Sequence, residues 1–400
     1  MAIAGIAIAF IVITLLVQRK VPLGPALLTG AAIVGLTSGK NPLEIITIAY
    51  HGLLEPASIN LILTLGMISM LGSIMQKESL LSRMVGSLQT VLRSTKLTIM
   101  FVPSIIGTLL VTGGAIMSAP TVEELGKELD LPPERMAAIN LLFRHGWYFV
   151  YPLMPAFVMV TSITGLELNR LLVAQIPLSV AVLVAGYFTF LHGVPDKGKD
   201  KPAPTAADVG RLTAYTAPIW VSLTLTVAFG LPFPVALLVG MGVAFAVARV
   251  AVSRIPMLLY KGINWPIVLS GVGIMVFKAV TSQVDALPVL IENMLAAGLP
   301  ARALFVILPF VAGIVSASNT SALGLTLPLL LPAMQSTDLV LFGTVAAYTS
   351  SFVGYFASPL HLCQVLTLAH FRCDIMKLYR EYLYPILAIS VTLLALGFIL

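Results

Sequence analysis

The chain has 400 residues, of which 58% are hydrophobic and only 10% are charged, and its formal net charge is +6 at pH 7. A soluble globular chain has about 45–50% apolar and about 25% charged residues. So few charges cannot cover a surface that faces water, which excludes an ordinary soluble domain. The positive charge is modest and follows from the membrane topology described below, so we expect no nucleic-acid partner.

Long apolar runs occur in both halves of the chain. Several approach the ~20 residues that a helix needs to cross a bilayer, among them Met1–Val17, Val21–Ser38, Ile59–Met75, Leu171–Leu191 and Leu383–Leu400. They are continuously apolar rather than alternating, which favours helices over barrel strands. The first run lacks the charged start of a signal peptide, so we expect a retained span. The sequence therefore predicts an all-α polytopic membrane protein whose main partner is the lipid bilayer.

The second half of the sequence repeats features of the first at an offset of about 206–210 residues. The matching pairs include Ala26-Leu27-Leu28-Thr29-Gly30 with Ala236-Leu237-Leu238-Val239-Gly240, Pro103 and Gly107 with Pro309 and Gly313, and Tyr148-Phe149 with Tyr355-Phe356. Each pair alone would be chance. Their common order and nearly constant offset predict an internal duplication.

Each half has the same predicted series of elements. The first repeat covers 1–192, with scaffold spans in 1–92, a hairpin and a broken helix in 97–163, and a span at 166–192. A hydrophilic cytoplasmic linker, 193–208, follows. The second repeat covers 209–400, with scaffold spans in 213–299, of which the first is expected at 213–229, a hairpin and a broken helix in 302–370, and a span at 376–400.

The positions of Lys and Arg test this arrangement. If 97–130 and 302–335 are re-entrant hairpins, each half crosses five times, giving about ten transmembrane helices, two hairpins and an inverted second half. Of the 23 Lys and Arg residues, Arg144 and Lys278 fall within spans and three lie on one side, which leaves 18 on the other. The positive-inside rule makes the richer side cytoplasmic. We therefore expect a multi-pass protein of a prokaryotic inner membrane with both termini outside.

Four breaks in the apolar pattern mark the expected site. Two are hairpin tips, Thr112-Gly113-Gly114 and Ser318-Asn319-Thr320, and two are proline breaks, Tyr151–Pro155 and Ala357–His361. Irregular backbone at membrane depth is tolerated only within protein or beside a wet cavity. Paired discontinuous helices near the midplane are typical of the binding sites of secondary transporters.

The breaks predict ion-binding chemistry. Helices that begin after the two tips would direct free N–H groups and a positive dipole end at one cavity, which suits a carboxylate or another anion. Freed carbonyls near Gly114, with the side-chain oxygens of Thr112, Ser318, Asn319 and Thr320, suit Na⁺ as a coupling ion. No other cofactor is expected.

Three ionisable residues lie near the breaks. Arg144 would pair with substrate or bind carbonyls of the first hairpin; the alternative is a structural bridge to Glu123 or Glu124. His145 and His361 would shuttle protons, or serve as structural histidines. Cys363 and Cys373 have no metal-like spacing and are expected to be packing residues. The predicted substrate-binding set is Thr112, Gly113, Gly114, Arg144, His145, Pro152, Ser318, Asn319, Thr320, Ser358, Pro359 and His361.

Ser318-Asn319-Thr320, on a hairpin after an amphipathic helix, resembles the Ser-Asn-Thr signature of divalent anion/sodium symporters. The arrangement resembles the wider ion transporter superfamily, which includes gluconate and citrate permeases and the large membrane subunits of tripartite carboxylate transporters. Gly113–Pro120 and Ser358–Leu362 are most similar to an uncharacterised prokaryotic integral-membrane family within it. The resemblance implies an elevator-type carrier whose scaffold forms a homodimer. The first tip departs from the symporter pattern, because it has Gly113-Gly114 where the signature has Asn-Thr.

The expected function is secondary active transport of a small organic anion, and there are three alternatives. These are a membrane subunit of a multi-component carboxylate transport system, a channel, and an intramembrane enzyme. An enzyme is not expected, because the sequence contains no HExxH motif and no paired aspartates within a span.

Overall fold

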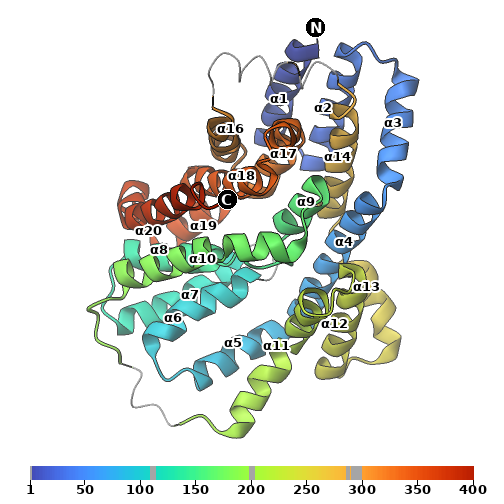
Figure 1. Ribbon diagram of the computed structural model, residues 1–400. Coiled ribbons are helices and arrows are strands. Elements are labelled where there is room, and N and C mark those ends of the chain that lie inside the picture. Colours follow the sequence, from blue (N-terminus) through green and yellow to red (C-terminus); the bar gives the residue numbers. More distant parts are fainter. Residues whose placement is uncertain (1, 109–113, 198–202, 285–288, 290–299) are drawn as a thin grey trace.

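The computed structural model describes residues 2–108, 114–197, 203–284, 289 and 300–400, and these ranges contain helices and no strands (Figure 1). The first half contains α1 (Ala2–Gln18), α2 (Leu23–Thr37), α3 (Pro42–Leu54), α4 (Pro56–Lys77), α5 (Leu80–Val91), α6 (Thr95–Thr108), α7 (Gly114–Glu128), α8 (Pro133–His145), α9 (Pro155–Thr164) and α10 (Leu168–Phe190). The prediction of an all-α protein is confirmed.

The described part of the second half is also a series of helices. It contains α11 (Ala206–Val227), α12 (Phe233–Ala248), η1 (Val252–Arg254), α13 (Ile255–Gly262), α14 (Trp265–Thr281), α16 (Ala301–Ser316), α17 (Asn319–Ser336), α18 (Val340–Ala357), α19 (Leu362–Phe371) and α20 (Ile375–Leu396). Most of the amphipathic stretch that ends the expected scaffold at 213–299 lies outside the described residues.

Among the described residues, three helical segments are long and apolar enough to cross a membrane, namely α4, α10 and Val340–Phe371, which contains α18 and α19. A fourth is added if Val252–Gly262 and Trp265–Thr281, which meet at 51°, act as one span. The other apolar helices in the described ranges are shorter, so the expected ten crossings remain a prediction.

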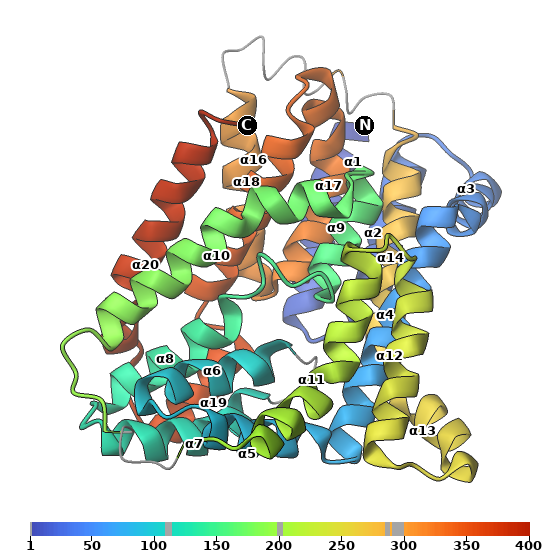
Figure 2. The same ribbon diagram turned by 60° about the horizontal axis from the view of Figure 1, so that its bottom comes forward.

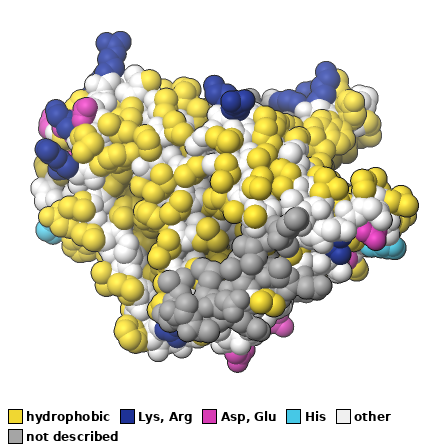
Figure 3. Space-filling model, turned by 90° about the horizontal axis from the view of Figure 1, so that it is seen from above, with side chains coloured by type: hydrophobic (Ala, Val, Ile, Leu, Met, Phe, Trp, Pro, Cys, Tyr) yellow, Lys and Arg dark blue, Asp and Glu magenta, His cyan; other side chains and the backbone are white. Residues whose placement is uncertain are grey.

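Apolar side chains also cover outward faces of the helices. On α10, Val173, Ile176, Val180, Val184 and Phe188 are all exposed and recur every three or four residues, which places them on one helix face. Figure 3 shows hydrophobic side chains spread over the face seen from above, with Lys and Arg mainly towards its margins. Exposed apolar faces of this size are consistent with a protein that inserts into a membrane.

The helices pack as two groups, and each group combines both halves of the chain. The first helix group contains α1–α5 with α11–α14, and the second helix group contains α6–α10 with α16–α20. Within the first group the backbones of α2 and α14 lie very close, since a Cβ built on Gly24 would lie 2.2 Å from the carbonyl oxygen of Leu269. Small residues permit this approach between membrane helices.

Contacts made by helices of the first half have counterparts made by helices of the second half. In the first group, α2 packs on α14 as α12 packs on α4, and α3 packs on α14 as α13 packs on α4. In the second group, α6 packs on α7 and α8 as α16 packs on α17 and α18. Likewise α7 packs on α19 as α17 packs on α9. In Figure 2 both termini lie towards the upper edge and the start of α11 towards the lower edge.

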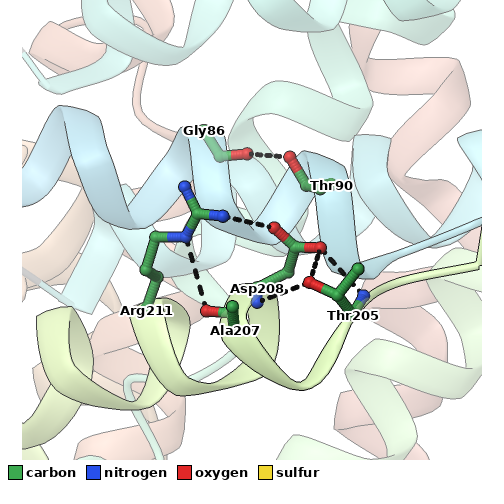
Figure 4. Close-up of polar contacts among 6 residues, drawn as sticks. All are labelled: Gly86, Thr90, Thr205, Ala207, Asp208 and Arg211. Atoms are coloured by element: carbon green, nitrogen blue, oxygen red, sulfur yellow. Dashed lines mark hydrogen bonds and ion pairs between the residues drawn. The ribbon is translucent and has the colours of Figure 1, made fainter.

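α11 begins at Ala206, before the expected start at 213, because a capping box initiates it (Figure 4). The amide of Asp208 donates to Oγ1 of Thr205 at 3.2 Å, and the amide of Thr205 donates to Oδ2 of Asp208 at 2.8 Å. Arg211 adds a 3.0 Å bond to Oδ1 of Asp208. The box satisfies N–H groups that the first turn of a helix leaves free, and the helix therefore extends into the predicted linker.

Candidate functional site

The second predicted tip is a tight turn between two helices. α16 ends at Ser316, Ala317 adopts a left-handed conformation with φ of 49°, and Ser318 caps α17. Oγ of Ser318 accepts hydrogen bonds from the amide of Ser321 at 3.2 Å and from its hydroxyl at 2.9 Å. The turn therefore places the N-terminus of α17, with its free N–H groups, inside the second helix group.

Asn319 is the first residue of α17, and its side chain lies inside the protein with 4% exposure. Its Oδ1 accepts a 2.6 Å hydrogen bond from the hydroxyl of Ser351, in the interior of α18. Its Nδ2 is buried and has no hydrogen-bond partner among the described residues. An amide donor is thus held in place at a helix N-terminus and left free.

Four polar residues follow one face of α18 and its end: Tyr348, Ser351, Tyr355 and Ser358. Their spacing of three, four and three residues aligns them on the helix. The hydroxyl of Tyr348 donates to the carbonyl oxygen of Tyr148 at 2.7 Å, and that of Ser358 donates to the carbonyl oxygen of Ile314 at 2.6 Å. Through these hydrogen bonds, α18 holds both the second tip and the first proline break in place.

Both proline breaks are present as interruptions between helices. Between α8 and α9, residues 146–154 leave the helix, and Pro152 is buried there. Between α18 and α19, residues 358–361 also leave the helix. Ser358 is buried there, whereas Pro359 is exposed. Pro152, Ser358 and the second tip thus belong to the interior of the second helix group.

Arg144 is a buried cation near the end of α8, with 5% exposure. Its Nε and Nη1 have no hydrogen-bond partner among the described residues, and no ion pair joins it to a carboxylate there. Glu123 binds Lys127 at 2.6 Å and His370 at 2.8 Å instead. The alternative of a structural bridge from Arg144 to Glu123 or Glu124 is not found among the described residues.

His145 and His361 come together although 216 residues separate them. Their ring centroids lie 5.1 Å apart, and both side chains are buried. Nδ1 of His145 lies 2.7 Å from the carbonyl oxygen of Leu141, so Nδ1 carries the proton and Nε2 accepts from the hydroxyl of Tyr355 at 3.1 Å. Neither ring nitrogen of His361 has a hydrogen-bond partner among the described residues.

The remaining predicted ligands are less defined. Thr112 and Gly113 lie outside the described residues, and Gly114 begins α7. Thr320 is half-buried. The oxygens of Ser318 and Asn319 already accept hydrogen bonds. The Na⁺ site remains a prediction.

The sequence analysis missed a buried network around Asn140 on α8. Its Nδ2 donates to the carbonyl oxygen of Ala115 and to Oγ1 of Thr367, both at 3.1 Å, and its Oδ1 accepts from the hydroxyl of Ser118 at 2.6 Å. These bonds join α7, α8 and α19 close to the start of α7. The available signal was a single amide within the apolar run that leads to Arg144.

A cavity of about 420 Å³ lies between the two helix groups, beside the first proline break. The second group contributes α6 and the break, including Ser104, Thr108, Trp147 and Tyr151, and the first group contributes α5 and α11, including Thr213 and Thr216. Nε1 of Trp147 is buried without a hydrogen-bond partner among the described residues. The cavity is large enough for a small organic solute.

Comparison with known proteins assigns the chain to a family but assigns no activity to it. No curated protein matches the chain. A protein-family model described as "Protein of unknown function (DUF401)" matches residues 2–400. The match covers almost every residue, including both tips, both breaks and the buried polar residues between them, so the chain belongs to the DUF401 family.

Proposed function

We propose that this protein is a secondary active transporter of a small organic anion in a prokaryotic inner membrane. The observation that carries the proposal is the guanidinium of Arg144, which is buried in the second helix group and whose Nε and Nη1 have no acceptor among the described residues. Leaving a buried cation without a partner costs several kcal/mol. A bound carboxylate would supply the missing charge and acceptors.

The second tip also favours a negatively charged ligand. The side-chain oxygens of Ser318 and Asn319 are occupied, whereas Nδ2 of Asn319, a donor at the positive end of α17, has no partner among the described residues. Trp147 adds a third unpaired donor beside the cavity between the groups. Surplus donors within the second helix group favour an anion over a cation as the solute, so Na⁺ would act as a coupling ion rather than as the transported solute.

The packing supports a carrier mechanism. The second helix group holds the candidate site, and the first group contacts it through α4 with α9, α14 with α17, α1 with α16 and α5 with α6. We propose that α6–α7 and α16–α17 are re-entrant hairpins of two inverted repeats, that the second group moves against a dimeric first group, and that both termini face outward. This arrangement is the elevator scheme of the ion transporter superfamily, with Na⁺ or a histidine-borne proton as the coupling ion.

A ligand screen tests the anion site. Purified protein is heated with monocarboxylates, dicarboxylates and tricarboxylates, with and without Na⁺, and unfolding is followed by tryptophan fluorescence. We expect one class to raise the unfolding midpoint of the native protein and to have no effect on Arg144→Gln. The matched control is Arg135→Gln, on the same helix, which removes a half-exposed ion pair with Glu381 at 3.2 Å and should keep the ligand response.

Transport then separates the alternatives. In proteoliposomes, the stabilising anion should accumulate when a Na⁺ or proton gradient is imposed, and accumulation should saturate. Flux at rates far above a carrier in single-channel recording would favour a channel, and turnover of the anion without a gradient would favour an enzyme. Stabilisation of Arg144→Gln equal to that of the native protein would refute the site.

A further inference from the structure

Three possible metal ligands meet where the two proline breaks approach each other. They are His145 at the end of α8, His361 just before α19, and Cys363 in the first turn of α19. One ligand atom from each lies within 4.8 Å of the other two. Both histidines are buried and Cys363, a free thiol, is half-buried. The cluster cannot be recognised in the sequence, because 216 positions separate His145 from His361, although only two separate His361 from Cys363.

The hydrogen bond of His145, and the lack of one at His361 among the described residues, both suit metal coordination. Histidines that bind metals usually donate their second ring N–H to a carbonyl or carboxylate, which fixes the tautomer. Nδ1 of His145 makes this bond to the carbonyl oxygen of Leu141, at 2.7 Å, and leaves Nε2 as an acceptor, which lies 3.1 Å from the hydroxyl of Tyr355. His361 is 1% exposed, and both of its ring nitrogens have no hydrogen-bond partner among the described residues. An imidazole buried without any partner calls for a ligand.

We propose that His145, His361 and Cys363 form a binding site for a soft monovalent metal ion, Cu(I). Thiolate and imidazole together select Cu(I) or Zn(II) rather than Na⁺, Mg²⁺ or Ca²⁺, which prefer oxygen. The thiol proton leaves when the Cys363 sulfur binds the metal. Cu(I) with one thiolate and two neutral imidazoles then carries no net charge, whereas Zn(II) with the same ligands carries +1.

Charge decides between the two metals. The buried guanidinium of Arg144 belongs to the residue next to His145 in the chain, so a positive charge already lies near the cluster. In a low-dielectric interior a second net positive charge is strongly unfavourable. The neutral Cu(I) complex avoids this repulsion. The site does not rest on the proposed transport of an anion, because Arg144 is not one of its ligands.

Binding requires small movements. Metal–ligand distances of about 2.0–2.3 Å place three ligand atoms about 3.5–4 Å apart, so the cluster must contract by about 1 Å. The hydroxyl of Tyr355, which donates to Nε2 of His145 at 3.1 Å, must also release that nitrogen. Removal of this hydroxyl should therefore favour the metal.

The test is competition for Cu(I) without oxygen. Purified protein is mixed with ascorbate, Cu(I) and the coloured chelator bathocuproine disulfonate, and the chelator's absorbance gives the metal that the protein removes. We expect the native protein to take one Cu(I) per chain. Cys363→Ser and His361→Ala should each weaken binding about 10–100-fold or more. The matched control Cys373→Ser removes the other cysteine, on the loop before α20, and should bind normally; Tyr355→Phe should bind as tightly or more tightly.

A second readout does not depend on substituting the ligands. In the Cys373→Ser protein, Cys363 is the remaining thiol, and one equivalent of Cu(I) should block its reaction with a membrane-permeant maleimide while Na⁺ should not. The proposal is overturned if the native protein leaves all Cu(I) on the chelator, if Cys363→Ser still takes one equivalent, or if Cu(I) fails to protect Cys363. Visible bands from bound Co(II), as a probe for Zn(II), at metal concentrations below those needed for Cu(I) would also overturn it.

Discussion

Gly107 on α6 lies directly against the backbone of Arg144 on α8, since a Cβ built on the glycine would lie 2.1 Å from the carbonyl oxygen of Arg144. The second half has the same relationship, because a Cβ on Gly313 of α16 would lie 2.4 Å from the carbonyl oxygen of Ser351 on α18. Arg144 and Ser351 therefore occupy corresponding places, each beside the first arm of a helix pair. Ser351 binds the tip residue Asn319, and Arg144 holds the corresponding place in the first half of the chain.

The two glycines provide the first prediction. Gly107→Ala and Gly313→Ala should each destabilise the protein by about 1–3 kcal/mol or more, because the added methyl meets backbone that cannot give way. Thermal unfolding followed by tryptophan fluorescence measures the change. The matched controls are Gly86→Ala on α5 and Gly242→Ala on α12, where a Cβ would meet nothing within 4 Å.

Both controls should be neutral or stabilising by up to about 1 kcal/mol, because alanine favours helix over glycine. Should Gly107→Ala and Gly313→Ala unfold at the same temperature as these controls, the close packing of α6 on α8 and of α16 on α18 would be wrong.

Ser351 gives the second prediction. Ser351→Ala removes the hydroxyl that donates to Oδ1 of Asn319 at 2.6 Å and leaves that oxygen buried without its partner, a loss of about 1–3 kcal/mol. The amide is then free to turn its Nδ2 away from the site, so the stabilising anion should bind more weakly. Calorimetric titration of the anion measures this.

The matched control for Ser351 is Ser336→Ala, at the far end of α17. The hydroxyl of Ser336 bonds only within its own helix, to the carbonyl oxygen of Ala333 at 3.2 Å. This variant should bind the anion normally. Equal affinity in Ser351→Ala and the native protein would show that the orientation of Asn319 does not matter for binding.

Topology gives the third prediction. Lys197, before α11, is expected in the cytoplasm, and Lys40, between α2 and α3, outside. In a protein with Cys363→Ser and Cys373→Ser, a cysteine at position 40 should react with an impermeant maleimide added to intact spheroplasts, and one at position 197 only after lysis. Labelling of both positions in intact spheroplasts would mean that the chain crosses the membrane an even number of times between them. The inverted repeat requires an odd number.

The sequence predicted the helical fold and the position of the second turn well, because both depend on local signals. Apolar runs define helices such as α4 and α10, and Ser318 has the polar side chain that caps α17. The partner of Asn319 could not be predicted, because Ser351 becomes its neighbour only when α18 packs against the tip. The same holds for Cys363, whose approach to His145 depends on the packing of α19 against α8.

The early start of α11 gives the last prediction, which concerns pH. Hydrogen bonds from the hydroxyl and amide of Thr205, with the charge of Arg211, lower the pKa of Asp208 below its ordinary value of 3.8. A carboxylate whose pKa is lowered on folding stabilises the folded cap above that ordinary value, and the contribution is lost as the pH falls through the lower folded pKa. Amides at the start of α11 should therefore keep constant protection from hydrogen exchange above about pH 4 and lose protection below it.

Asp208→Asn removes the charge and should lower this protection at all pH values and abolish its change near pH 4. The start of α14 is the internal control, because its cap is Asn264, whose Oδ1 accepts from the amide of Ile267 at 3.3 Å and does not titrate. Hydrogen–deuterium exchange with mass spectrometry, expressed as protection factors, follows both helix starts in one sample. If protection at α11 changes with pH no more than protection at α14, Asp208 does not hold the cap in its charged form.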